Sequence, residues 1–357
     1  MAGWTVGLLV AIPQAAFLCV SACAQIAVPP APASSPAQTE CRDCLHIYVE
    51  TTEKSDKPVG GLQAADFTLL DNNQPVRMAG FKAIDAAHPP ADPVQVLIIL
   101  DAINSDYLVV ARERDEVGAF LKQNGGKLAY PTSIAVLTEN GLKMSEGPSQ
   151  DGEALLEALN ATRTELRKIR TAGGAYADGE RMQICYDQFS HLADIEKVQP
   201  GRKIVLFVSP GWPLLAYAAR DIDMDHRQSN FDIIVRLSNG LREAGVTLYV
   251  LDPSNGGNQN TYEYQGFLNG VTKPIQAQYA NLAAQVLAEH SGGRVIVNGN
   301  DIKGEINNAL RDLTAYYELA FEPASPGEST EYHALTVKVD KPRVKVRTTA
   351  GYYTAHP

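Results

Sequence analysis

One carboxylate and one hydroxyl lie just beyond an apolar stretch of the chain. Residues 94–100 (VQVLIIL) are apolar except for Gln95, a pattern typical of a strand buried on both faces of a sheet. Asp101 follows this run directly and Ser105 comes four residues later. In open α/β sheets ligands bind at the carboxyl ends of strands, and Mg²⁺ prefers oxygen ligands. Asp101 and Ser105 are therefore candidate ligand-binding residues at this edge of the sheet.

Alternating strand and helix patterns surround this stretch. Between residues 93 and 314, short apolar runs alternate with amphipathic segments of helical spacing, which is typical of a parallel sheet with helices on its faces. We expect strands at residues 94–100, 133–138, 142–145, 203–209, 247–252 and 294–297. The predicted fold class is α/β, with a doubly wound, mostly parallel sheet of the Rossmann type.

Two β-rich segments flank the α/β region. Residues 45–88 and residues 315–357 each have the pattern of short strands separated by turns, and the Pro-rich residues 88–93 mark a domain boundary. Segments too short to form a stable sheet alone pair with other strands. We therefore expect a small discontinuous β-domain made of both segments, with the α/β domain of residues 93–314 inserted in it. The alternative is that residues 316–354 pair only among themselves.

The start of the chain indicates export. Residues 1–24 carry no charged side chain, and an apolar core precedes the tripeptide Ala22–Ala24, as in a secretory signal peptide. We expect an extracytoplasmic protein, either secreted, periplasmic or attached to the cell envelope. Two alternatives stay open: a bacterial lipobox ending at Cys23 would place a lipid anchor on this residue, and an uncleaved leader would itself be an anchor. Residues 25–44 are rich in Pro, Ala and Ser and predict a flexible linker.

Two cysteines in this linker form a C-x-x-C pair. Outside the cytoplasm, Cys41 and Cys44 can close a local disulfide. Free thiols and a redox pair are the alternatives, and a zinc site would need a second pair of ligands. Cys185 falls on the apolar face of a predicted helix, so we expect it in the core.

Composition and missing motifs exclude several classes of function. The net charge of −10 and the lack of a basic cluster exclude a general nucleic-acid binder, because such binding depends on neutralising phosphates. The chain has no G-x-S-x-G, no G-x-x-x-x-G-K-[ST] and no H-E-x-x-H motif, and its seven His are scattered. We predict that the protein is not an enzyme.

Several stretches of the chain carry a resemblance to a known family. They are PVGGLQAADFTLLDNNQPVRMAGF at residues 58–81, PGRKIVLFVSPGWPL at 200–214, GVTLYVLDPSNGG at 245–257 and the closing strands from AYYELAFEP at 315–323 onward. With the Asp-x-x-x-Ser sequence after the first core strand, they resemble the bacterial VWFA-related family, which is similar to von Willebrand factor A (VWA) domains. The resemblance covers nearly the whole mature chain. It implies a VWA-like fold and an extracytoplasmic location, without a known activity.

The resemblance also implies where a cation would bind. In VWA domains the ligands come from an Asp-x-Ser-x-Ser motif, a Thr before a helix and an Asp in a later turn. Here Ile103 replaces the middle Ser, Ala175 stands in the region of the Thr, and Pro210 replaces the Asp. We therefore expect a degenerate motif and no cofactor, with Asp101 hydrogen-bonded to the start of the first helix. The alternative is a reduced site in which Asp101 and Ser105 bind Mg²⁺ or Mn²⁺.

A second acidic run is a weaker candidate for a metal site than Asp101 and Ser105. The sequence from Asp221 to Asp232 resembles the start of a calcium-binding EF-hand loop. Its sixth position is His226, where the sharp turn requires Gly, and no Glu closes the loop. We interpret the run as a solvated acidic loop.

Aromatic residues after two strands predict a recognition surface. Trp212 follows the fourth predicted core strand, and a polar loop after the fifth contains further aromatic residues. With Asn104, the candidate binding residues on this rim are Trp212, Tyr262, Tyr264 and Phe267. Exposed aromatic side chains suit protein recognition, although the same residues could instead cover the end of the sheet. We predict a VWA-like protein that binds another protein or a glycan without a metal, and the alternative is cation-dependent binding.

Overall fold

The computed structural model describes residues 1, 3, 44–92, 94–162, 174–212, 222–253, 259–297, 301–325, 327 and 330–354, without the side chains of residues 175 and 259–262. All helices and strands named below lie in one compact unit, Glu40–Pro357. The predicted linker apart from Cys44 lies outside the described residues, as do Cys23 and the rest of the predicted signal peptide apart from Met1 and Gly3. Cys41 belongs to the part of the linker that is not described. Within the described part, no helix is both long and apolar enough to cross a membrane.

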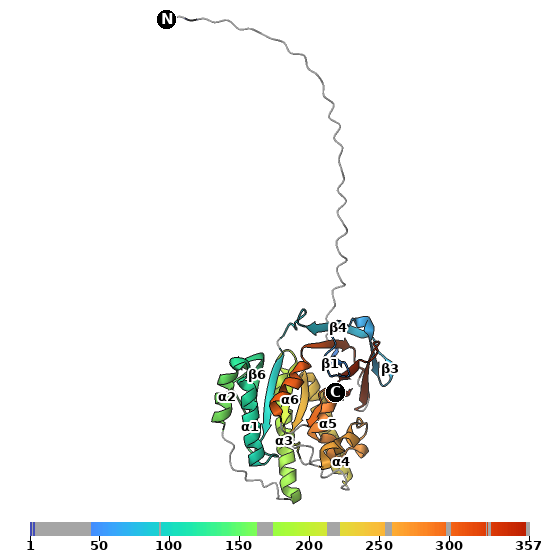
Figure 1. Ribbon diagram of the computed structural model, residues 1–357. Coiled ribbons are helices and arrows are strands. Elements are labelled where there is room, and N and C mark those ends of the chain that lie inside the picture. Colours follow the sequence, from blue (N-terminus) through green and yellow to red (C-terminus); the bar gives the residue numbers. More distant parts are fainter. Residues whose placement is uncertain are drawn as a thin grey trace. The chain divides into compact units, whose positions relative to one another are not determined.

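A seven-stranded sheet forms the centre of the unit (Figure 1). Its strands are β5 (Gln95–Asp101), β6 (Lys127–Thr138), β7 (Gly141–Met144), β8 (Ser149–Asp151), β9 (Lys203–Val208), β10 (Val246–Asp252) and β11 (Val295–Val297). Their order is β11-β10-β9-β5-β6-β7, with β8 also beside β6. Strands β7 and β8 each run antiparallel to β6, and the other described pairs of this sheet are parallel. The predicted mostly parallel sheet is confirmed. From β5, later strands are added outward on both sides, β6 and β7 on one side and β9, β10 and β11 on the other, so the strand order reverses between β5 and β9.

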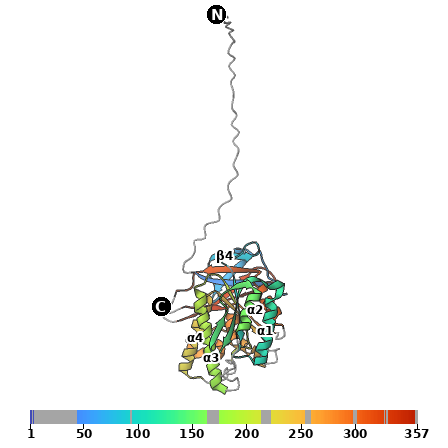
Figure 2. The same cartoon turned by 90° about the vertical axis from the view of Figure 1, so that its left-hand side faces the viewer.

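Helices cover both faces of this sheet (Figure 2). The helices α1 (Tyr107–Leu121), α2 (Gly152–Ala161) and α6 (Ile302–Arg311) lie on one face, and α3 (Gly174–Lys197), α4 (Met224–Glu243) and α5 (Ala284–His290) lie on the other. Strand β5 shows why both faces are covered, because its side chains alternate. Ile98 packs in the core that contains Val117 of α1, and Ile99 packs in the core that contains Phe189 of α3.

Two four-stranded sheets pack face to face as a β-sandwich. One has the order β14-β1-β12-β4 and the other β15-β13-β2-β3. The strands are β1 (Leu45–Thr52), β2 (Phe67–Asp71), β3 (Gln74–Pro75), β4 (Met78–Asp85), β12 (Ala315–Phe321), β13 (Tyr332–Val339), β14 (Lys345–Thr348) and β15 (Gly351–Tyr353). Each sheet combines strands from both ends of the chain, since β1 and β4 pair with β12 and β2 pairs with β13. The apolar residues between the sheets include Ile47, Leu69, Leu319 and Val337.

A tight hairpin joins β2 and β3. Asn72 and Asn73 form its two-residue loop, and their φ angles are 47° and 64°. Two-residue hairpins need positive φ at both loop positions, and Asn tolerates this conformation better than most residues.

Arg202 links the β-sandwich to the central sheet through its side-chain contacts. It precedes β9, is 2% exposed, and donates a hydrogen bond to Glu50 of β1. Its guanidinium lies over the rings of both Tyr48 and Tyr316, 4.7 Å and 4.5 Å from their centroids, and these two rings contact each other edge-on. It also donates to Thr247 Oγ1 at 3.3 Å. The charge is buried, paired and stacked on aromatic faces, which offsets the cost of its desolvation.

Removing one partner of this pair should be costly. We expect Arg202→Met to lower the free energy of unfolding by about 3–5 kcal/mol, because Glu50 stays buried without its counter-ion. Urea denaturation measures this loss. The matched control is Lys82→Met, which breaks an exposed pair with Glu318 and should cost less than about 1 kcal/mol. Equal losses in the two variants would contradict the role given to Arg202.

Candidate functional site

The candidate site lies where the order of the central strands reverses. Asp101 is the last residue of β5, and Ser209 follows the last residue of the neighbouring β9. Both side chains are completely buried. In α/β sheets this position, at the carboxyl edge, is where ligands bind. The predicted location of Asp101 is therefore correct, and its surroundings decide what it can do.

The carboxylate of Asp101 is fully used by hydrogen bonds from the protein. Its Oδ1 accepts from the backbone N–H groups of Ile103 at 3.0 Å and Asn104 at 2.9 Å. Its Oδ2 accepts from Asn104 Nδ2 at 2.9 Å and from Ser209 Oγ at 2.5 Å. A carboxylate offers about four acceptor positions, so this set leaves none for another ligand. Burial raises the pKa of Asp101, and the hydrogen bonds from Ser209 and Asn104 oppose that rise.

The middle position of the motif is part of the core. Ile103 is 0% exposed and packs with the side chains that cover the α3 face. Asn104, predicted on the binding rim, faces inward instead. Its amide group bonds to Asp101 and lies 3.5 Å from Cys185 Sγ. The prediction of Asn104 as a surface binding residue is therefore wrong.

Ser105 faces a buried glutamate that the sequence argument missed. Glu113 of α1 is 0% exposed. Ser105 lies close enough to lower the pKa of Glu113, yet neither side chain has a hydrogen bond of normal geometry within the described residues. Glu113 falls in the apolar stripe of α1, between Val110 and Val117. A charged residue inside an apolar helical stripe is the sequence signal that could have identified Glu113 as a buried glutamate.

The environment of Glu113 favours its neutral form. Burial is the main cause that raises its pKa to about 8, and the charge of Asp101 adds to this, as does Asp252 at the end of β10. Arg112 opposes the rise, but its guanidinium donates to the carbonyl of Pro253 at 2.9 Å. Glu113 is therefore mostly protonated at neutral pH.

The later loops supply no replacement ligand within the described residues. Pro210 stands where VWA domains have an Asp, and its carbonyl accepts from Gln285 Nε2 at 3.2 Å. The side chain of Ala175 lies outside the described residues. No group of three or more Asp, Glu, His or Cys side chains is placed to hold a metal ion in the part of the chain that is described. With Asp101 saturated and Ile103 buried, the positions that supply the cation ligands in VWA domains do not fit a divalent cation here.

The acidic run before α4 caps a helix. Asp223 is the N-cap residue, and its carboxylate accepts from the backbone N–H of His226 at 2.9 Å. N-cap Asp residues are common because they satisfy a free N–H group of the first turn. Asp221 lies outside the described residues.

The aromatic residues predicted on the rim are mostly buried. Trp212 is 2% exposed, its Nε1 donates to the carbonyl of Leu282 at 2.9 Å, and its ring packs edge-on against Phe189. Tyr264 is buried and Phe267 is half-buried against the same core. An exposed aromatic rim is therefore wrong for Trp212 and Tyr264, because these rings extend the core over the sheet. The side chain of Tyr262 lies outside the described residues.

A different set of side chains is exposed at the carboxyl edge. Helices α1, α3 and α4 each run back toward the start of the next central strand, so their first turns lie at this edge (Figure 1). Arg227 near the start of α4 donates to the carbonyl of Ile275 at 2.8 Å, which places Ile275 beside it. The exposed residues are Tyr107 (71%), Leu108 (80%), Tyr176 (79%), Met224 (53%) and Ile275 (56%). We call these five residues the apolar rim.

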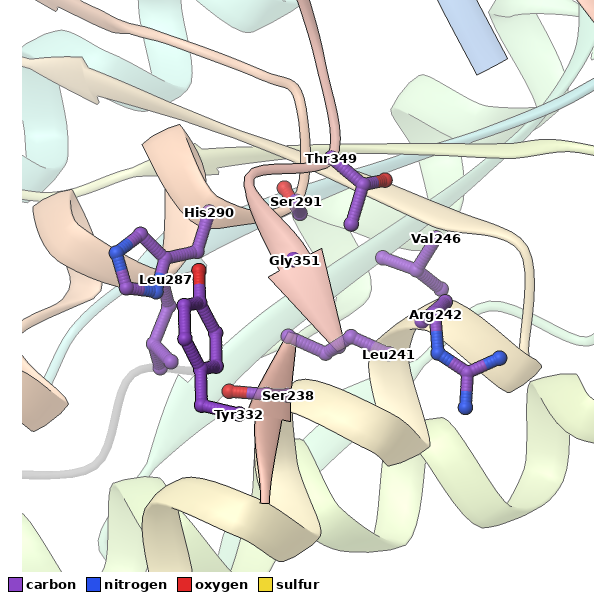
Figure 3. Close-up of a pocket in the computed structure, with 10 residues that line it drawn as sticks. All are labelled: Ser238, Leu241, Arg242, Val246, Leu287, His290, Ser291, Tyr332, Thr349 and Gly351. Carbon is purple, nitrogen blue, oxygen red and sulfur yellow. The ribbon is translucent and has the colours of Figure 1, made fainter. Parts of the chain in front are cut away.

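A cavity lies where α4 and α5 meet the β-sandwich (Figure 3). Ser238 of α4, His290 of α5 and Tyr332 of β13 are among its lining residues. Its volume of about 20 Å³ is room for about one water molecule. The cavity is too small to bind a ligand.

The cysteines fall into two environments. Cys44 is disulfide-bonded, while its predicted partner Cys41 lies outside the described residues, so this pairing stays a prediction. Cys185 is a free thiol that is completely buried in the core on the α3 face. Burial raises its pKa well above the usual value, so the thiol is neutral and unreactive.

Comparisons with known proteins find only distant structural likeness. No protein-family model and no curated protein matches the chain. The human COPII-coat protein Sec24c is 9% identical with a TM-score of 0.30, and the match covers 74% of this chain and 44% of that one. The pilus adhesin SpaC from Lactobacillus rhamnosus GG is 8% identical with a TM-score of 0.35, covering 82% and 49%. The N-terminal domain of TFIIH p34 is 12% identical with a TM-score of 0.27, covering 60% and 96%. This chain thus spans less than half the length of the first two proteins.

Divalent cations should leave the stability of the protein unchanged. A cation present at about 100 times its dissociation constant would add about 2.7 kcal/mol, a shift of about 4 °C in a chain of this size. We expect the thermal midpoint to be the same in EDTA, Mg²⁺, Mn²⁺ and Ca²⁺, because Asp101 has no free acceptor position. A cation-induced rise that Asp101→Ala abolishes would refute this expectation.

Glu113 should make stability depend on pH in one direction. Its folded-state pKa of about 8 lies above the ordinary 4.5, so the contribution of Glu113 to stability is complete below about pH 4.5 and is lost as the pH rises toward 8. Glu113→Gln stays neutral and should be more stable than the wild type by about 2–4 kcal/mol at pH 8. Urea denaturation across this pH range measures the difference. Asp115→Asn, an exposed change on the same helix, should keep the wild-type slope; a Glu113→Gln profile parallel to the wild type would disprove the assignment.

Proposed function

We propose that the protein is an extracytoplasmic, VWA-like binding protein whose apolar rim docks another protein without a metal ion. The observation that carries this proposal is the gathering of exposed apolar side chains at the carboxyl edge of the sheet. Nine large hydrophobic residues are exposed in the described part of the chain, and five of them belong to the apolar rim. Single exposed apolar residues are ordinary, whereas several around one edge are typical of an interaction surface.

The fold supports the VWA-like part of the proposal. The sheet has helices on both faces, an antiparallel edge strand β7, and a carboxylate at the end of β5 where the strand order reverses. These features agree with the resemblance in the sequence. In this protein Asp101 holds the turn after β5 through hydrogen bonds to Ile103 and Asn104, so the carboxylate supports the rim structurally.

The chemistry of the rim favours a protein as the partner. Tyr107 and Tyr176 supply large, amphipathic contact surfaces, and Leu108 is the most exposed member of the set. Tyrosine is enriched among the residues that contribute most to protein interfaces. The carboxylate of Asp101 is buried and saturated with hydrogen bonds, so we give it no catalytic role. We therefore assign no catalytic residue.

One observation favours cation-dependent binding as the second candidate function. The hydroxyl of Ser105 and both oxygens of Glu113 are buried without a hydrogen-bond partner in the described residues. Such oxygens are potential ligands of a hard cation. A neutral Glu113 is the simpler explanation, and unfolding in EDTA and in divalent cations separates the two.

Substitutions on the apolar rim should abolish capture of the partner. The full chain is immobilised and exposed to envelope proteins of its native source, and bound proteins are quantified by mass spectrometry. We expect Leu108→Glu and Tyr176→Glu each to reduce capture of a specific protein by tenfold or more, as for residues central to an interface. The matched control is Val198→Glu, because Val198 is 78% exposed just past the end of α3, away from the rim. If the rim variants capture as much as the control, docking at this rim is excluded.

A further inference from the structure

Strand β4 is the outermost strand of its sheet in the β-sandwich (Figure 1). Its eight residues, Met78–Asp85, pair with β12 on one side. On the other side, no described residue forms a backbone hydrogen bond with β4 before Asp85, which ends the strand. Free strand edges readily pair with another strand, so this edge is a candidate interaction surface.

Backbone groups of alternate residues in β4 point to the free edge. The N–H of Asp85 donates to the carbonyl of His88 at 3.1 Å, and the N–H of His88 donates back to the carbonyl of Asp85 at 3.2 Å. Both backbone groups of Asp85 therefore point away from β12, and this direction alternates along an antiparallel strand. The pairing with β12 skips Ala79, a bulge that shifts the alternation by one residue. The other residues whose backbone groups point to the free edge are Met78, Phe81 and Ala83.

The side chains of these three residues face the interior of the sandwich. Each is half-buried and packs against the apolar core between the two sheets. The ring centroid of Phe81 lies 5.5 Å from that of Phe67 and 5.8 Å from that of Tyr317. A strand added to β4 would therefore extend both the sheet and this core, as strand addition to an open sheet edge does.

The charge of Lys82 limits which strand can pair with β4. Lys82 is exposed at the centre of the strand, and a Lys on an edge strand deters pairing. A partner strand must have an uncharged or acidic residue opposite Lys82, because like charges directly opposite each other are destabilising. A glycine or an acidic residue satisfies this condition, and another base does not.

Strand β4 of a second copy satisfies this condition. When two β4 strands pair antiparallel about a twofold axis at Phe81, Lys82 faces Gly80 of the second copy. Because the bulge at Ala79 takes up one position, Ala83 then faces Met78 of the second copy. The register thus places free backbone groups opposite free backbone groups and apolar side chains opposite apolar side chains. At each end of the paired segment, the exposed Arg77 lies near Asp85 of the second copy, which carries the opposite charge.

We propose that two copies of the chain associate through their β4 strands, which pair antiparallel about a twofold axis at Phe81 and join two sheets into one. Twofold interfaces of this kind, in which the same surface of each copy is used, are the commonest in homo-oligomers. The dimer is weak and reversible, because pairing of single strands buries a small area. This inference goes beyond the docking of a protein at the apolar rim, and neither depends on the other.

Sedimentation velocity of the full chain tests the association. We expect mostly monomer at about 5 µM and a rising fraction of dimer toward about 500 µM. Ala83→Pro removes an N–H group that points away from β12, so it should weaken the dimer by tenfold or more. The matched control on the same strand is Lys82→Gln, which should dimerise at least as well as the wild type because this side chain faces Gly80.

Two cysteine variants test the register. Phe81→Cys places a thiol of each copy at the twofold axis, so oxidation in air should give a disulfide-linked dimer on a non-reducing gel. Lys82→Cys places the two thiols out of register, and little linked dimer should form. Thermal unfolding shows whether each variant is folded, and the two cysteine variants decide the outcome if Ala83→Pro is not.

Three results would overturn the proposal. The first is a monomer at every concentration. The second is a dimer that a folded Ala83→Pro variant leaves unchanged, particularly one that the rim variant Leu108→Glu abolishes, since the copies would then meet at another surface. The third is equal disulfide linkage of Phe81→Cys and Lys82→Cys.

Discussion

The ion pair between Arg202 and Glu50 holds the β-sandwich against the amino edge of the central sheet. Two charges are removed from water there, and the cost is offset by a direct hydrogen bond, by Thr247 and by the two tyrosine rings that contact the guanidinium. A second buried link lies nearby, where Arg347 of β14 donates to Asp312 Oδ2 at 2.6 Å. Because these contacts are directional as well as strong, they fix one orientation of the sandwich.

Because the sandwich is attached at the amino edge of the central sheet, the carboxyl edge is available for binding. The sandwich contacts the side where the central strands begin, while Asp101 and the starts of α1, α3 and α4 lie where the strands end (Figure 1). At that edge the burial of Asp101 and Ile103 makes the first loop rigid. A rigid loop presents Tyr107 and Leu108 at low entropic cost, which is an advantage for a binding surface.

The sequence predicted the central sheet better than it predicted the site. The run at residues 94–100 identified β5 because a strand covered on both faces must be apolar throughout. The short β8 was missed, since Ser149–Asp151 has no apolar pattern and is defined by its pairing with β6. Trp212 was placed at the right end of its strand, but local sequence does not show whether a ring turns inward or outward. That choice depends on distant neighbours, here Leu282 and Phe189. The same limit applies to Glu113, because the burial that mainly raises its pKa and the charge of Asp101 that adds to it both depend on packing against distant residues.

The sandwich joins the two ends of the folded chain, and this has a consequence for how the protein is made. Strand β1 pairs with β12 and β14, and its hydrogen bonds join residues 272 and 300 positions apart, as in His46–Glu318 and Tyr48–Thr348. Contacts of such sequence separation form late and slowly. A growing chain therefore cannot close its sandwich until β12, β13 and β14 have been synthesised, and until then β1 and β2 have unpaired edges. A chain terminated before β12 exposes those edges permanently.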